Sequence, residues 1–127
     1  MSTFAPATLL AIFAGAGVGG VVRHGLSLLV GRLAGTAFPY GTLCVNIVGG
    51  FILGLLVGWW AGQGVSPQWR AFLVTGVLGG FTTFSAFTLE TVTLIERHQT
   101  TLAFAYIAAS VTGALLALAA GLWLSRL

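Results

Sequence analysis

The chain has 127 residues, of which 57% are hydrophobic and only 6% are charged. Soluble domains carry about 25% charged residues, so this composition excludes an ordinary soluble protein and indicates an integral membrane protein. The net charge of +3 comes from five basic and two acidic residues, which are too few to indicate a nucleic-acid partner.

Four hydrophobic windows are long enough to cross a bilayer, which takes about 20 mainly apolar residues in a helix. We expect helices at about 5–30, 40–61, 69–95 and 101–124, in one domain covering residues 1–127. The N-terminus lacks the basic region of a secretory signal, so we expect the first window to be retained as a span. The predicted fold is an all-α membrane protein with four transmembrane helices.

The first window contains a charged residue, Arg23, near its end. A charge within the membrane is costly and by default indicates a function. An arginine near a helix end can instead extend its guanidinium to the interface. The position of Arg23 in the sequence leaves both interpretations open.

The second window places Thr42 and Asn46 one helical turn apart, on a shared face. The amide of Asn46 can donate two hydrogen bonds, either to a neighbouring helix or to a ligand. Cys44 is the only cysteine, so an intrachain disulfide is excluded, and we expect it to be a small buried apolar residue.

The third window is poorly suited to one continuous helix. Gly79 and Gly80 each cost roughly 1 kcal/mol of helix propensity relative to alanine. The hydroxyls of Thr82, Thr83 and Ser85 follow and can bond to backbone groups that the helix would use. We expect a break at the glycines. Because unpaired backbone groups are costly in lipid, a break must be buried or line a wet path, as at ion sites in broken membrane helices.

Polar but nearly uncharged side chains recur in the last three windows. In the third, Phe84 and Phe87 share a face that continues toward Glu90. Hydroxyls and amides can donate to an anion without binding it too tightly for conduction, and the rim of a phenyl ring is electropositive. This pattern favours a small, hard anion as the ligand. The polar residues concerned are Thr42, Asn46, Ser85, Tyr106 and Ser110.

The arginines give almost no orientation signal. Arg70 and Arg126 fall on one side of the membrane in the predicted topology, and Arg32 and Arg97 fall on the other. The positive-inside rule therefore does not favour either orientation. Either another feature sets the orientation, or the chain inserts both ways and pairs antiparallel with itself.

Three motifs resemble those of the CrcB/Fluc fluoride channels, and the resemblance covers essentially the whole chain. The first is Gly19-Gly20 with Arg23. The second is the run 41–46, which ends in Asn46 and is followed by Gly49-Gly50. The third is the run 79–87, Gly-Gly-Phe-Thr-Thr-Phe-Ser-Ala-Phe.

The resemblance implies an antiparallel, dual-topology homodimer with two passive, fluoride-selective pores that export cytoplasmic fluoride. It implies a multi-pass protein of the bacterial plasma (inner) membrane, whose partners are a second copy, fluoride and the lipid bilayer. It also implies a structural Na⁺ at the dimer centre, held by the backbone carbonyls of Gly79 and Thr82.

The resemblance also implies roles for individual side chains. Arg23 matches the arginine near the aqueous vestibule. One departure is Ala114, where some members carry another hydroxyl one turn beyond Ser110. The fluoride pore is expected to involve Asn46, Phe84, Phe87, Tyr106, Ser110, Thr42, Ser85 and Glu90.

Two other classes of function remain as alternatives. A small proton-coupled multidrug-type exporter of dual topology needs a membrane carboxylate, but the first window has none, and Glu90 and Glu96 lie late in the third. A non-transporting membrane scaffold leaves the interrupted third window unexplained. The chain has no aspartate and no nucleophile, metal-ligand or phosphate-loop motif, so we do not expect an enzyme.

Overall fold

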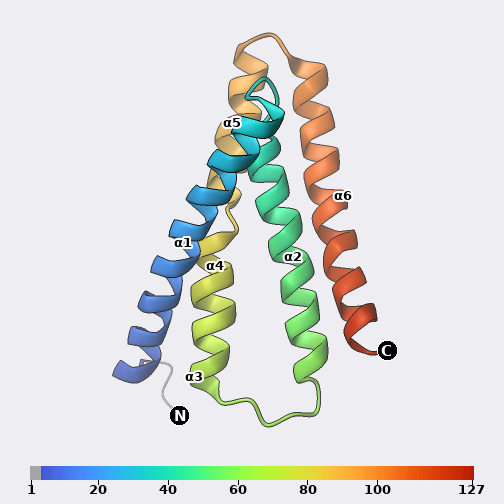
Figure 1. The fold of residues 1–127 in the computed structure, drawn as a ribbon. Coiled ribbons are helices and arrows are strands. Elements are labelled where there is room, and N and C mark those ends of the chain that lie inside the picture. Colours follow the sequence, from blue (N-terminus) through green and yellow to red (C-terminus); the bar gives the residue numbers. More distant parts are fainter. Residues whose placement is uncertain (1–3) are drawn as a thin grey trace.

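A computed structural model describes residues 4–127, and four long helical segments run alternately up and down through it (Figure 1). Within the described residues, each of these four is long and apolar enough to cross a membrane. They are α1 (Pro6–Ala34), α2 (Tyr40–Trp60), a composite third segment (Pro67–Glu96) and α6 (Thr100–Ser125). The chain is therefore an all-α, multi-pass membrane protein, as its sequence predicts.

The third segment is interrupted. It starts as α3 (Pro67–Arg70) and continues as η1 (Ala71–Leu78), a π-helix. The short α4 (Gly79–Phe81) follows, and α5 (Phe84–Glu96) begins only after two non-helical residues. π-Helical turns are rare overall and occur often at functional sites, and here a π-helix lies on the N-terminal side of the interruption.

The predicted interruption of the third helix is present, but it lies just after Gly79 and Gly80 rather than at them. Gly79 is helical, with φ −63° and ψ −36°, and Gly80 lies within α4. A Cβ atom at Gly80 would overlap the backbone of Ala16 in α1. Gly80 therefore allows two helices to approach closely, and the residues that leave the helix are Thr82 and Thr83.

The helices pack as two close pairs, α1 with η1 and α4, and α2 with α6 (Figure 1). A Cβ atom at Gly19 would overlap the carbonyl of Val77, and one at Gly54 would overlap the carbonyl of Leu118. Lipid provides little hydrophobic drive for helix association, so such backbone-to-backbone packing stabilises membrane helices. The small residues thus determine which helices pair.

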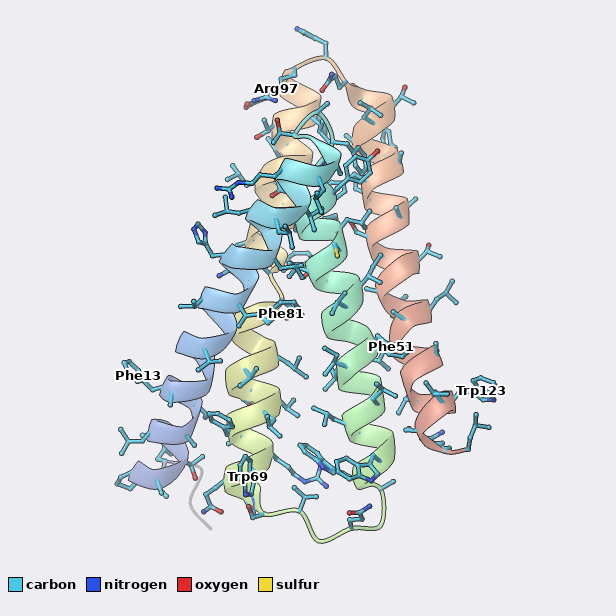
Figure 2. The ribbon with its side chains drawn as sticks, in the orientation of Figure 1. Phe13, Phe51, Trp69, Phe81, Arg97 and Trp123 are labelled. Atoms are coloured by element: carbon cyan, nitrogen blue, oxygen red, sulfur yellow. The ribbon has the colours of Figure 1, made fainter. Side chains whose placement is uncertain are left out.

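Large apolar side chains cover the outside of the molecule. Phe13 is 80% exposed and points outward, as does Trp123 (Figure 2). Only Tyr106 and Val45 are both large and fully buried among the described residues. This distribution is expected when lipid surrounds the protein.

The two ends of the molecule differ in their aromatic residues. Trp69 and Trp123 lie toward the same end, opposite Arg97 (Figure 2). Trp59 and Trp60 finish α2 at that end as well. There the guanidinium carbon of Arg70 lies 5.4 Å from the centre of the Trp60 ring, a cation–π contact that joins α2 to the third segment. All four tryptophans of the chain therefore lie at one end.

Candidate functional site

Two residues in extended conformation interrupt the third segment. Thr82 has φ −77° and ψ 155°, and Thr83 has φ −148° and ψ 121°. The Thr83 hydroxyl accepts a hydrogen bond of 3.1 Å from the backbone N–H of Ala86, which makes it the N-cap of α5. The two threonines thus end one helix and start the next within the bundle.

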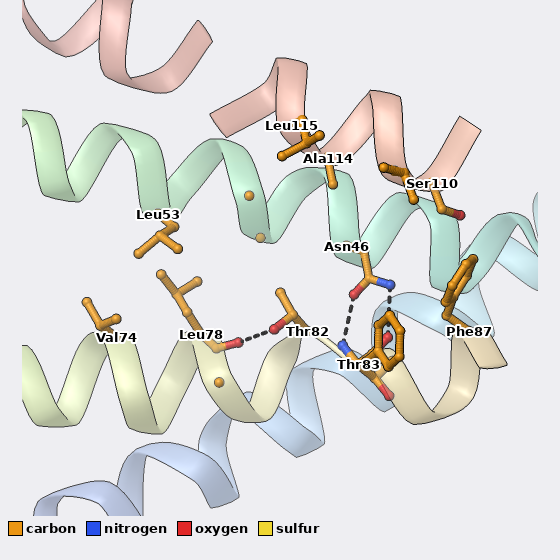
Figure 3. A pocket seen from close by; sticks show the side chains of 15 residues that line it. Asn46, Leu53, Val74, Leu78, Thr82, Thr83, Phe87, Ser110, Ala114 and Leu115 are labelled. Carbon is orange, nitrogen blue, oxygen red and sulfur yellow. Dashed lines mark hydrogen bonds between the residues drawn. The ribbon is translucent and has the colours of Figure 1, made fainter. Parts of the chain in front are cut away.

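A single amide side chain bridges this interruption from α2. Asn46 Oδ1 accepts a hydrogen bond from the backbone N–H of Thr83 at 2.8 Å, and Asn46 Nδ2 donates to the Thr83 carbonyl at 3.0 Å (Figure 3). These two bonds fix the orientation of the amide, because the reversed amide would place like groups together. An amide nitrogen carries two hydrogens, so one donor of Asn46 remains available.

Other groups satisfy part of the backbone around the interruption. Arg23 Nε, from α1, donates to the Gly80 carbonyl at 3.1 Å. The Leu78 carbonyl accepts from both the backbone N–H and the hydroxyl of Thr82, each at 2.9 Å. No hydrogen bond within residues 4–127 uses the carbonyl oxygens of Gly79 or Thr82. The C-terminal end of the first half-helix therefore carries free acceptors beside one fixed cation.

A pocket of about 480 Å³ opens beside the interruption (Figure 3). Ser110, from α6, contributes to its wall; this residue is only 7% exposed, and its Oγ has no hydrogen-bond partner among residues 4–127. An unpaired buried hydroxyl is costly, which suggests that a ligand normally completes its bonding. The wall consists of Asn46, Gly49, Gly50, Leu53, Val74, Leu78, Gly79, Thr82, Thr83, Phe84, Phe87, Ser110, Val111, Ala114 and Leu115.

Aromatic rings lead away from this pocket. The ring centres of Phe84 and Phe87 are 5.5 Å apart, and Phe87 lies 5.2 Å from Tyr106. Phe84 is 75% exposed, which is unusual for a ring at a pocket wall. One side of the site is therefore open in the single chain.

A second polar cluster lies beyond Phe87. One carboxylate oxygen of Glu90 accepts a hydrogen bond from the hydroxyl of Thr42, and the other accepts one from the hydroxyl of Tyr106, both at 2.7 Å. Bonds of this length to a carboxylate are charge-assisted. In this structure the two hydroxyls are therefore committed to Glu90.

The structure divides the predicted site residues into groups. The pocket brings together Asn46, Phe84, Phe87 and Ser110 with Gly79 and Thr82, whereas Thr42, Glu90 and Tyr106 form the adjoining cluster. Arg23 reaches the interruption from α1, and Ser85 lies exposed outside the pocket wall, with its hydroxyl 3.2 Å from that of Thr83.

The sequence predicts that the Thr83 hydroxyl bonds to the backbone, as it does with the N–H of Ala86, but it does not predict that the backbone groups of Thr83 pair with Asn46. The signal that could have indicated it is Asn46 itself, because an amide in a membrane helix needs a partner with both a donor and an acceptor. A backbone residue released from a helix provides both groups.

The sequence of this chain is similar to those of known proteins. Residues 10–122 match the family described as CrcB-like protein, Camphor Resistance (CrcB). A protein of Methylobacterium nodulans named Fluoride-specific ion channel FluC is 48% identical over 92% of this chain and 94% of its own length. A protein of the same name from Granulibacter bethesdensis is 53% identical over 84% of this chain and 87% of its own length. The family match over most of the chain and the identity to these relatives show that the chain belongs to the CrcB family.

Proposed function

We propose that this protein is a passive, fluoride-selective channel that exports fluoride from the cytoplasm of a bacterium across the inner membrane. The observation that supports it most is the pocket at the interruption, where, within the described part of the chain, Asn46 retains one free donor and the buried Ser110 hydroxyl has no partner. The similar bacterial proteins that carry the name fluoride-specific ion channel agree with this proposal.

The chemistry of the pocket suits a small anion. Its polar groups are amides and hydroxyls, which donate hydrogen bonds without the deep energy minimum that a fixed cation in the wall would create. Phe84 and Phe87 add ring edges, whose positive rim can face an anion. Thr42, Tyr106 and Glu90 extend the polar path beyond Phe87, and Ser85 extends it at the exposed side. Arg23 supplies the positive field of an aqueous vestibule near the interruption.

The functional unit is an antiparallel homodimer with two pores. Phe84 is a pocket-wall residue that is 75% exposed, so a single chain leaves the path open on that side. A second copy seated there would close the path, and twofold symmetry would produce a second path.

The asymmetry of the ends supports antiparallel pairing. Tryptophan is enriched at both membrane interfaces, yet all four tryptophans of this chain lie at one end. A head-to-tail pair has an aromatic belt at each interface. The arginines divide evenly between the ends, with Arg70 and Arg126 at one and Arg32 and Arg97 at the other, so they favour neither orientation.

The dimer centre fits a structural Na⁺. Hard cations prefer oxygen ligands, and the carbonyl oxygens of Gly79 and Thr82 are unused by hydrogen bonds within residues 4–127. The described chain has no cluster of three or more His, Cys, Asp or Glu side chains, so backbone oxygens are the suitable ligands. A bound Na⁺ would be coordinated by these carbonyl oxygens and would join the two copies. Arg23 and Asn46 donate to the neighbouring carbonyls of Gly80 and Thr83.

Fluoride efflux from liposomes that contain the purified protein tests the function. We expect rapid fluoride release once a potassium ionophore balances the charge, with no comparable release of chloride. Liposomes without protein are the control. Chloride release at the rate of fluoride would contradict selectivity, and absence of fluoride release would contradict the channel itself.

The same assay distinguishes a proton-coupled exporter. Glu90 is the observation that favours this alternative, since it is a carboxylate within a spanning segment. Both of its oxygens accept hydrogen bonds from hydroxyls, so the carboxylate has a structural role that does not require proton exchange. Transport that requires a proton gradient would favour the exporter, whereas a passive channel follows the fluoride gradient alone.

A further inference from the structure

The loop between α1 and α2 holds an aromatic side chain in a fixed place. Pro39 has φ −78° and ψ 61°, and the N–H of Tyr40 donates to the carbonyl of Phe38 at 2.8 Å. This is an inverse γ-turn, in which proline already restricts φ. The backbone of Phe38 is therefore held just before α2 begins.

The ring of Phe38 packs against the buried ring of Tyr106. Their centres are 5.5 Å apart with an interplanar angle of 82°, an edge-to-face contact. Phe87 contacts the same tyrosine, with ring centres 5.2 Å apart. Tyr106 is fully buried, and both phenylalanines pack on the apolar cluster that contains it. Two rings from separate elements thus restrict Tyr106.

The restricted ring directs a hydroxyl to a charged group. The Tyr106 hydroxyl donates to one oxygen of Glu90, while Thr42 donates to the other. Each donated bond offsets part of the negative charge on the carboxylate. If Tyr106 turned away, Glu90 would present more charge to any anion on the path, and like charges repel.

We propose that Phe38 is a positioning residue for anion permeation: it holds Tyr106 so that its hydroxyl screens Glu90. This inference rests on the proposed fluoride channel and names a residue outside the pocket wall. It also predicts whether fluoride flux rises or falls when the ring of Phe38 is removed. A ring that merely plugged the path would increase flux when removed, whereas a ring that positions Tyr106 decreases flux when removed.

The first experiment compares fluoride efflux in Phe38→Ala and in a matched control. We expect Phe38→Ala to lower the fluoride flux about two- to tenfold, the equivalent of one aromatic contact. Phe13→Ala, which removes an 80% exposed ring, should leave the flux unchanged. If Phe38→Ala does not yield folded protein, Phe38→Leu keeps much of the volume without the ring and should also lower the flux. Unchanged or increased flux in the folded variant would overturn the proposal.

A double-mutant comparison separates positioning from general packing. If Phe38 acts through the Tyr106 hydroxyl, Phe38→Ala should add less than about twofold in a Tyr106→Phe background, because coupled residues are non-additive. Two effects that simply multiply would overturn the assignment.

A spectroscopic readout is independent of transport. The chain has two tyrosines, so Tyr40→Phe leaves Tyr106 as the single site for fluorotyrosine labelling. We expect Phe38→Ala, but not Phe13→Ala, to shift its ¹⁹F resonance. An unshifted resonance would overturn the positioning role. If the wild-type protein conducted no fluoride, the proposed function would fail, while a shifted resonance would still support the contact between the rings.

Discussion

At the scale of single residues, the amide of Asn46 combines two tasks. It replaces the helical partners of Thr83 with one accepted and one donated hydrogen bond, and it keeps one N–H for a ligand. The same side chain thus stabilises the interruption and serves the pocket beside it. A substitution of Asn46 is therefore expected to affect both stability and transport.

Asn46→Asp should lower fluoride efflux at least about tenfold. The carboxylate would keep an acceptor for the Thr83 N–H but place negative charge against the Thr83 carbonyl, and an unsatisfied buried group costs about 1–3 kcal/mol. The measurement is efflux from liposomes with equal protein. Gln63→Glu, the same chemical change at an exposed loop residue, is the control and should conduct normally. Normal conduction by Asn46→Asp would exclude Asn46 from the path.

Ser110→Ala should separate stability from transport. The Ser110 hydroxyl has no partner among the residues that the structure describes, so its removal costs no hydrogen bond there and should leave the thermal unfolding midpoint unchanged or slightly higher. Fluoride flux should fall about two- to tenfold if this hydroxyl donates to the ion. Ser125→Ala, on the same helix but bonded to the Leu122 carbonyl, should not change flux. A large loss of stability in Ser110→Ala would indicate a structural role instead.

At the scale of elements, glycine contacts set the helix pairs, and they can be tested by a matched pair of substitutions. Gly54→Ala should destabilise the protein by about 1–3 kcal/mol, because its Cβ would overlap the Leu118 carbonyl across the α2–α6 contact. Gly17→Ala, where nothing lies within 4 Å, should be neutral or stabilising by about 0.5–1 kcal/mol. Thermal unfolding in detergent measures both. Equal effects of the two substitutions would contradict the packing described here.

Hydropathy predicts the four spans well, because about 20 apolar residues are needed for each and the loops are short. The position of the interruption is predicted less well. Helix propensity points to Gly79 and Gly80, but both remain helical, and Gly80 packs closely on α1. The helix ends where Asn46 supplies substitute partners for Thr83, and that information lies 37 residues away in the sequence.

The same limit applies to the candidate site. The sequence identifies Thr42, Glu90 and Tyr106 as polar residues along a path, and the structure shows that they bond to one another. Such bonds depend on how three helices meet, which local spacing does not encode. No sequence motif indicates the role of Phe38, because a phenylalanine before a proline is typical of an ordinary loop.

At the scale of the whole molecule, the even distribution of arginines makes orientation sensitive to small changes in charge. A pair of added lysines at positions 36 and 37 (Thr36→Lys, Ala37→Lys) should fix one orientation, and a pair at 63 and 64 (Gln63→Lys, Gly64→Lys) should fix the other. If the active form is antiparallel, each biased variant alone should conduct poorly, and co-expression should restore flux.

The location of a C-terminal reporter checks that each variant is biased. Full activity of a single, uniformly oriented variant would contradict antiparallel pairing.

Removal of Na⁺ tests the centre of the proposed dimer. Protein purified and reconstituted without Na⁺ should show lower fluoride flux or weaker dimerisation, because the carbonyls of Gly79 and Thr82 would lose their ligand. Potassium at equal ionic strength is the control for general salt effects. Identical flux and dimerisation in both salts would contradict a structural role for the cation.

The two extended residues, Thr82 and Thr83, also uncouple the rotational phase of the two half-helices. In a continuous helix, each residue turns the next by about 100°, so the faces of both halves would be locked together. Here the face that carries Gly76 and Gly80 meets α1, while the direction of Phe84 and Phe87 is set separately by the extended link. One half of the span can therefore be optimised for tight packing without rotating the rings of the other half.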